Sequence, residues 1–140
     1  MTLEIAVTDD LEACHALRHA VFVIEQEIDP AEEWDDLDGQ AVHLLARQDG
    51  KPVGTARLLV TGDTGRIGRL CVLREARGLG VGAGLVRASL AHFRTQPGVK
   101  RVVLGAQCYA IGFYEGLGFE AHGPVYSDAG IPHRDMVQEL

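Results

Sequence analysis

The sequence predicts a single mixed α/β domain, with hairpin strands in its first half and crossover helices in its second. Asp49-Gly50 separates two apolar, β-rich segments, which is a strong hairpin signal. An apolar segment at 67–73 is followed by a glycine-rich loop and then by apolar residues at helical spacing. The 140 residues, 46% of them hydrophobic, suffice for one domain with a sizeable core, which we expect to span 1–140.

The N-terminal elements are predicted from alternation and helix-start signals. A half-buried first strand is expected because apolar residues alternate with polar ones. These residues are Leu3, Ile5 and Val7. Thr8 or Asp9 is expected to cap the helix that follows. Glu12 would complete a capping box, and the helix runs toward Phe22. Residues 24–38 are expected to form a short helix and an acidic loop.

The remaining elements alternate strands with helices. The expected strands lie at 41–48, 53–60, 67–73, 101–106, 119–126 and 133–139. The expected helices lie at 83–93 and 110–117. Pro97-Gly98 ends the first of these helices, and Gly118 suits a C-terminal cap for the second. The strand at 101–106 is apolar and β-branched at its centre, so we expect it to be buried.

Four glycines fall within seven positions between the strand at 67–73 and the helix that follows. They are Gly78, Gly80, Gly82 and Gly84. Such a loop leaves backbone N–H groups bare at a helix N-terminus, where the macrodipole adds partial positive charge. The segment therefore predicts a binding site for a phosphate group.

Two common phosphate-binding motifs fit this loop poorly. Gly78-x-Gly80-x-x-Ala83 matches the dinucleotide fingerprint, which requires a short strand-to-glycine turn and an acidic residue about 20 positions later. Five residues separate Val72 from Gly78, and no Asp or Glu occurs between Glu75 and Glu115. A P-loop is excluded because no Gly-Lys-Ser/Thr follows. A nucleotide-binding oxidoreductase is therefore disfavoured.

Two motifs resemble those of the GNAT superfamily of acyl-CoA-dependent N-acetyltransferases. Arg77-x-x-Gly80-x-Gly82, after the strand that ends at Val72, resembles its R/Q-x-x-G-x-G/A motif. Residues 107–119 resemble its second signature, a helix ending in Phe-Tyr-Glu-x-Leu-Gly-Phe. Three further segments resemble the ElaA-like subgroup, so the resemblance covers nearly the whole chain. They are 21–27, 41–44 and 129–133. One departure is Gln107, where many members carry asparagine.

The resemblance implies the GNAT acyltransferase fold, a mixed central sheet flanked by helices, with splayed middle strands that admit an acyl thioester. It also implies acetyl-CoA as the co-substrate, without a metal, and transfer of the acetyl group to a primary amine. The positions expected to bind acetyl-CoA are Leu70, Cys71, Val72, Arg77, Gly78, Leu79, Gly80, Val81, Gly82, Ala83 and Gln107. The backbone N–H of Val72 is expected to polarise the acyl carbonyl.

Acetyl transfer requires a proton acceptor and a proton donor. An alkylammonium with a pKa near 10.4 is neutral only about once in 2,500 molecules at pH 7. The departing thiolate needs a proton, and Tyr114 is the expected donor because a phenol stays protonated at neutral pH. Phe113 is expected only to anchor its helix.

Four residues are implied on the acceptor side, and the base among them stays open. They are Glu25, Glu27, His43 and His133. His133 is the most suggestive, because a stiff proline precedes it after a flexible turn.

The charge is divided along the chain. The net charge of −7 argues against nucleic acid and anionic membrane surfaces as partners. Residues 1–38 hold twelve acids and one base, whereas 66–101 hold eight bases and one acid. We expect coenzyme A to dock on the basic half and the acidic run at 32–38 to attract a cationic amine; the alternative is that this run is a solvated loop.

The remaining patterns in the sequence give weaker indications of function. His15 and His19 lack the rest of a zinc motif, and Asp36-Leu37-Asp38-Gly39 lacks the end ligands of a calcium loop. The three cysteines are widely spaced, which predicts reduced thiols. The N-terminus lacks a signal-peptide pattern, so a cytoplasmic protein is expected. A non-catalytic acyl-CoA-binding module stays open, as do the small-molecule or peptide amine that accepts the acetyl group and a homodimeric state.

Overall fold

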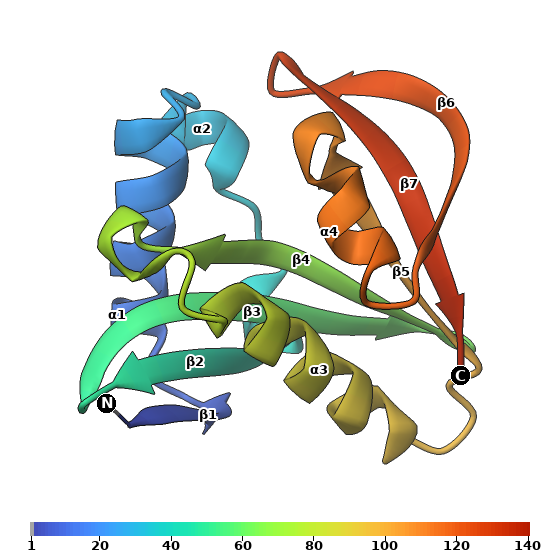
Figure 1. The fold of residues 1–140 in the computed structure, drawn as a ribbon, viewed down its shortest axis with the longest axis horizontal. Coiled ribbons are helices and arrows are strands. Elements are labelled where there is room, and N and C mark those ends of the chain that lie inside the picture. Colours follow the sequence, from blue (N-terminus) through green and yellow to red (C-terminus); the bar gives the residue numbers. More distant parts are fainter. Residues whose placement is uncertain (1) are drawn as a thin grey trace.

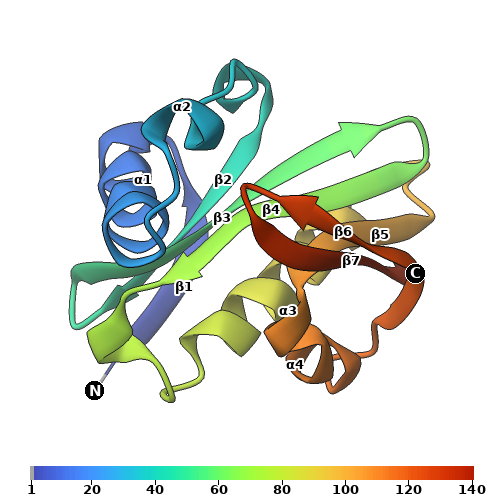
Figure 2. The ribbon, with the colours of Figure 1, turned by 90° about the horizontal axis from the view of Figure 1, so that it is seen from above.

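The structure, a computed structural model, describes residues 2–140 as one seven-stranded sheet with helices on both faces (Figures 1 and 2). The strands are β1 (Leu3–Thr8), β2 (Val42–Gln48), β3 (Lys51–Thr61), β4 (Thr64–Val72), β5 (Arg101–Gln107), β6 (Glu120–Asp128) and β7 (Ile131–Glu139). The helices are α1 (Leu11–Arg18), α2 (Pro30–Glu33), α3 (Val81–Arg94) and α4 (Ile111–Glu115). A π-helix, η1 (His19–Glu25), continues α1, and three short 3₁₀ turns are η2 (Asp38–Gln40), η3 (Arg74–Ala76) and η4 (Cys108–Ala110).

The first four strands form an antiparallel meander, as the hairpin signals predict. Asp49 and Gly50 both have positive φ, 51° and 83°, which suits the tight turn between β2 and β3. The helix cap differs from the expectation, because Asp10 rather than Thr8 or Asp9 accepts the N–H of Ala13, at 3.1 Å. Thr8 instead accepts the N–H of Asp10 through its hydroxyl, at 3.1 Å.

Helices cover the sheet from opposite sides, α1 and α2 on one face and α3 and α4 on the other (Figure 2). The larger core lies against α3 and includes Leu85 and Phe93, whereas Cys14 and Leu17 of α1 belong to a smaller one. The predicted burial of the first strand is wrong in part. Val7 is 60% exposed, because β1 is an edge strand and only Ile5 of its apolar residues packs on the larger core.

The sheet opens in its middle. β4 and β5 are parallel and pair only through Thr64–Arg66 and Arg101–Val103. β5 continues its pairing with β7 as far as Gln107. The strand order is β1-β2-β3-β4-β5-β7-β6, so the divergence of β4 from β5 separates four strands from three (Figure 1). The expected splay of the middle strands is therefore confirmed.

Within residues 2–140, the helices are all too short or too polar to cross a membrane.

Candidate active site

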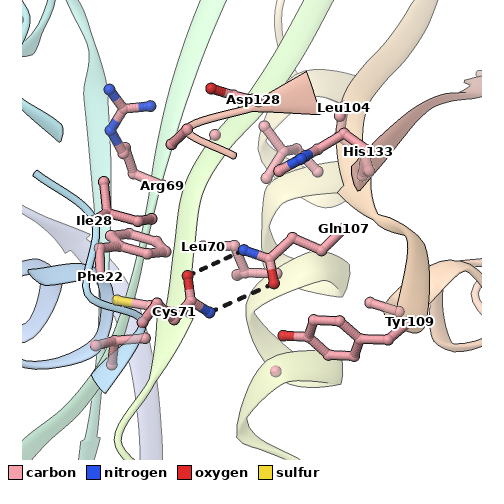
Figure 3. Close-up of a pocket in the computed structure, with 18 of the residues that line it drawn as sticks. Phe22, Ile28, Arg69, Leu70, Cys71, Leu104, Gln107, Tyr109, Asp128 and His133 are labelled. Atoms are coloured by element: carbon pink, nitrogen blue, oxygen red, sulfur yellow. Dashed lines mark hydrogen bonds between the residues drawn. The ribbon is translucent and has the colours of Figure 1, made fainter. Parts of the chain in front are cut away.

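A cavity of about 550 Å³ lies where β4 and β5 diverge. Arg66–Val72 of β4 line one side, and Leu104, Gly105 and Gln107 of β5 line the other. Figure 3 shows Phe22 and Ile28 beyond β4 and His133 beyond β5. Along the cavity, the edges of β4 and β5 that face each other are therefore not paired with a strand.

The free edge of β4 presents peptide groups to this cavity. The N–H of Leu73 donates to the carbonyl of Val53 on β3, at 2.9 Å. Successive N–H groups of a strand point to opposite edges, so the N–H of Val72 points away from β3 and toward the cavity. The carbonyl of Val72 faces the same way and accepts from Nε of Arg77, at 3.1 Å.

The glycine loop leads into α3 with the geometry of an anion site. Gly78 and Gly80 have φ of +79° and +84°, which favours glycine, and Gly80 caps α3 without a side-chain hydrogen bond. The first N–H groups of a helix have no partner within it, so those of 81–83 are available to a ligand. Gly82 lines the cavity, and a Cβ added there would lie 3.5 Å from Phe113 Cζ, which is an ordinary contact distance.

The predicted cofactor residues fall into two groups. Those that line the cavity are Leu70, Cys71, Val72, Arg77, Gly82 and Gln107. Those that do not are Gly78, Leu79, Gly80, Val81 and Ala83. The side chain of Val81 is 1% exposed and belongs to the core, so this residue can offer only its backbone to a ligand.

Arg77 has a partner that the sequence did not reveal. Both terminal nitrogens of its guanidinium donate to the carboxylate of Glu25, and Arg74 lies 3.5 Å from the same carboxylate. The hydrogen bond from Arg77 lowers the pKa of Glu25 and the pairing raises the pKa of Arg77. This ion pair holds Glu25 beside the glycine loop, and Glu25 does not line the cavity.

Tyr114 lines the cavity from α4. Its ring packs edge-on against Phe119 and Phe113, at centroid distances of 6.1 and 5.0 Å. Burial raises the pKa of its hydroxyl to about 12, so the phenol is protonated at neutral pH. Phe113 is 41% exposed and lines the cavity too, in addition to packing on Tyr114.

His133 lines the cavity from β7 with one ring nitrogen committed (Figure 3). Nδ1 lies 2.7 Å from the carbonyl of Ile131, which can only accept, so Nδ1 carries the proton. In this tautomer, Nε2 has a lone pair that can accept a hydrogen bond. The ring stacks on Tyr126, whose hydroxyl donates to Asp135 at 2.8 Å.

The other two acceptor-side candidates do not line the cavity. His43 is 4% exposed, and its Nε2 lies 3.0 Å from the carbonyl of Asp38. Glu27 is exposed and has a positive φ of 58°. Neither side chain is therefore placed to contact a ligand in this cavity, and their role in acceptor binding stays a prediction that the geometry does not support.

Part of the acidic run is paired with arginines from other segments. Asp38 accepts from Arg18 and Arg57, at 2.9 and 3.1 Å, and Asp35 accepts twice from Arg57, at 2.7 and 2.8 Å. Burial disfavours ionised Asp38, but hydrogen bonds from Arg18 and His15 hold its pKa well below the usual range. These arginines offset Asp35 and Asp38, while Glu32 and Glu33 of the same run line the cavity, so the expected attraction of a cationic amine stays a prediction.

Gln26 is a cavity residue that sequence reasoning missed. Its amide exchanges hydrogen bonds with Gln107, at 3.1 and 3.4 Å, and so joins η1 to β5 across the cavity (Figure 3, dashed lines). The two residues are 81 positions apart, and no local pattern links them. Tyr109, which is 82% exposed and lines the cavity, was missed as well. Its position inside the second motif was the available signal.

Metal-binding groups and reactive thiols are two further candidates for chemistry within residues 2–140. Over residues 2–140, no three His, Cys, Asp or Glu side chains are grouped so that they could hold a metal ion. The cysteines are free thiols, and Cys71 is buried as expected. Burial raises the pKa of Cys71 to about 12, which makes it a poor nucleophile.

Comparison with known proteins decides the family. The family model described as an acetyltransferase (GNAT) domain matches residues 10–140. The chain belongs to the GNAT acetyltransferase family. Protein ElaA of Escherichia coli is 37% identical over 134 residues, which cover 93% of this chain and 88% of ElaA. The crystal structure of Escherichia coli ElaA has a TM-score of 0.87 at 32% identity and covers 99% of this chain and 100% of its own.

Two further solved structures are similar. An acyl-CoA N-acyltransferase from Pseudomonas aeruginosa has a TM-score of 0.87 at 33% identity and covers 98% of this GNAT protein and 99% of its own chain. N-acetylglutamate synthase from Neisseria gonorrhoeae, crystallised with coenzyme A and N-acetylglutamate, has a TM-score of 0.72 at 20% identity. It covers all of this chain and 35% of its own, so this similarity shows the fold alone.

Proposed function

We propose that this GNAT protein is an acetyl-CoA-dependent N-acetyltransferase that moves an acetyl group directly to a primary amine. One observation carries the proposal. One cavity is lined by the unpaired edge of β4, by Tyr114 with its protonated hydroxyl and by His133. The N-terminus of α3, which has no side-chain cap, lies beside this cavity. These are the groups that acyl transfer from a thioester to an amine requires.

The donor would bind along β4. The N–H groups from Gly78 to Ala83 are suited to the diphosphate of coenzyme A, because they combine free donors with the positive end of a 14-residue helix. Gly82 supports this fit, since its missing side chain leaves the approach to those N–H groups open. Leu70, Cys71, Val72 and Gln107 would then border the pantetheine arm.

Three groups would carry the chemistry. Nε2 of His133 accepts a proton from the ammonium, and the amine nitrogen then forms a bond to the thioester carbon. The N–H of Val72 stabilises the negative oxygen of the tetrahedral intermediate. As that intermediate collapses, the C–S bond breaks and Tyr114 donates its proton to the departing thiolate, and the second proton lost by the amine nitrogen restores the Tyr114 phenol. The high pKa of Cys71 argues against an acyl-cysteine and supports direct transfer.

The test is release of free thiol from acetyl-CoA in the presence of a panel of amines, including polyamines, aminoglycosides and lysine peptides. Amine-dependent release, with the acetyl group recovered on nitrogen, is expected. Tight binding of coenzyme A without thiol release for any amine would favour the alternative, a non-catalytic acyl-CoA-binding module. Failure to bind coenzyme A would exclude both.

A further inference from the structure

β4 contains a strained bulge in its pairing with β3, within the stretch of β4 that lines the cavity. Thr55 pairs with Cys71 and Arg57 pairs with Gly68, so Arg69 and the residue after it stand opposite the single residue between Thr55 and Arg57. Arg69 has a φ of +49°, a left-handed conformation that is unfavourable for a residue with a side chain. Some interaction must hold this backbone in place.

The side chain of Arg69 is held by the acidic segment. Its Nη2 donates to the carbonyl of Glu33 at 2.9 Å and to the carboxylate of Asp35 at 3.2 Å. Asp35 also accepts two hydrogen bonds from Arg57, the β3 residue at the edge of the bulge. Asp35 therefore ties together both strands of the bulge, and we call Glu33, Asp35, Arg57 and Arg69 the clamp.

The bulge and the cavity share the same stretch of β4. Every residue from Arg66 to Val72 lines the cavity, whereas Asp35 does not. Arg57 is 5% exposed, so its hydrogen bonds with Asp35 hold Asp35 against the buried part of β3. We infer that Asp35 is a positioning residue, which holds the left-handed bulge of β4 through Arg69 and Arg57 and so directs the peptide groups of β4 toward the acyl donor. This inference rests on the proposed function.

A neighbouring residue separates positioning from simple charge attraction. Asp36 follows Asp35 in the same acidic run and is exposed, and it belongs to none of the ion pairs found among residues 2–140. A field that attracts a cationic amine would weaken when either carboxylate is neutralised. The clamp would weaken when Asp35 is changed but would not weaken when Asp36 is changed.

The first experiment compares Asp35→Asn with Asp36→Asn. For Asp35→Asn, we expect kcat to fall by roughly tenfold to a hundredfold, while KM for acetyl-CoA changes by less than about threefold. The reason is that a misdirected N–H group of β4 stabilises the transition state less but affects the binding of acetyl-CoA little. For Asp36→Asn, we expect no change in kcat. Equal increases of the amine KM in both variants, with kcat kept, would overturn the inference.

The second experiment removes the side chain of Arg69 in two ways. Glycine adopts a φ of +49° without strain and alanine does not, so Arg69→Gly should keep a kcat several-fold higher than Arg69→Ala. Equal kcat values in the two variants would contradict a role in holding the bulge. This comparison stands even where Asp35→Asn folds poorly.

Hydrogen exchange gives a readout that does not depend on activity. The amides of 68–72 should exchange faster in Asp35→Asn than in the wild type, while those of α3 stay unchanged. If the wild type transfers no acetyl group to any amine, the proposed function fails, but faster exchange at 68–72 would still support the clamp. Unchanged exchange at 68–72 would refute it.

Discussion

Replacing Gly82 with alanine adds one methyl group at the proposed diphosphate site. The new Cβ would lie 3.5 Å from Phe113 Cζ and 3.9 Å from Val72 Cγ2, which are ordinary contact distances. The protein itself therefore tolerates the methyl group. Alanine is a better helix former than glycine by up to about 1 kcal/mol, so the melting temperature should stay constant or rise slightly.

Binding of coenzyme A should respond in the opposite direction. A methyl group that keeps a phosphate from a backbone N–H removes a charge-assisted hydrogen bond, which contributes about 1.5–3 kcal/mol. The dissociation constant should therefore increase by about tenfold to 150-fold. Titration calorimetry with coenzyme A measures this constant, and differential scanning calorimetry measures the melting temperature of the same sample.

Two matched glycines serve as controls. Gly112 lies in α4, and a Cβ added there would have no neighbouring atom within 4 Å, so Gly112→Ala should leave coenzyme A binding unchanged. A Cβ on Gly84 would lie 2.7 Å from Ile5 Cδ1, the end of a flexible side chain that can move aside, so Gly84→Ala should leave both the stability and coenzyme A binding nearly unchanged. A folded Gly82→Ala protein that binds coenzyme A as tightly as the wild type would refute the proposed site.

Three other predictions concern named side chains. Tyr114→Phe should keep coenzyme A binding and lower kcat by about 10²-fold, as measured by thiol release. With a pKa of about 12, Tyr114 should cause no alkaline decline in kcat below about pH 11. Glu25→Gln should tighten coenzyme A binding a few-fold, because it frees Arg77 to bind phosphate, whereas Arg77→Ala should weaken this binding. Titration calorimetry measures both dissociation constants, and a shift of both in the same direction would contradict this competition between Glu25 and phosphate. Asp38 has a lowered pKa when folded, so its ionised form stabilises the protein above the unfolded pKa near 3.8, and this contribution is lost as the pH falls further. Urea unfolding should show a free energy that falls below about pH 4, and less steeply in Asp38→Asn.

Local elements could be predicted from the residues alone. The glycine loop, the hairpin turn at Asp49-Gly50 and the helix at 81–94 follow from backbone preferences and short-range periodicity, which act over a few neighbouring residues. The two motifs around Gly80 and Tyr114 indicated the family in the same way, because each lies within one continuous segment. In the folded chain, Gly82 and Tyr114 line the same cavity.

Which charges meet could be learned only from the folded chain. Asp35 lies 22 positions from Arg57 and 34 from Arg69, and Glu25 lies 52 from Arg77. These pairs depend on how α2 and η1 pack beside the strands, and no local pattern encodes that packing. Segregated charge along the chain therefore did not reveal which acids of the 32–38 run are paired with arginines and which of them line the cavity. In the folded protein, Coulomb attraction and the cost of burying unpaired charge bring these side chains together.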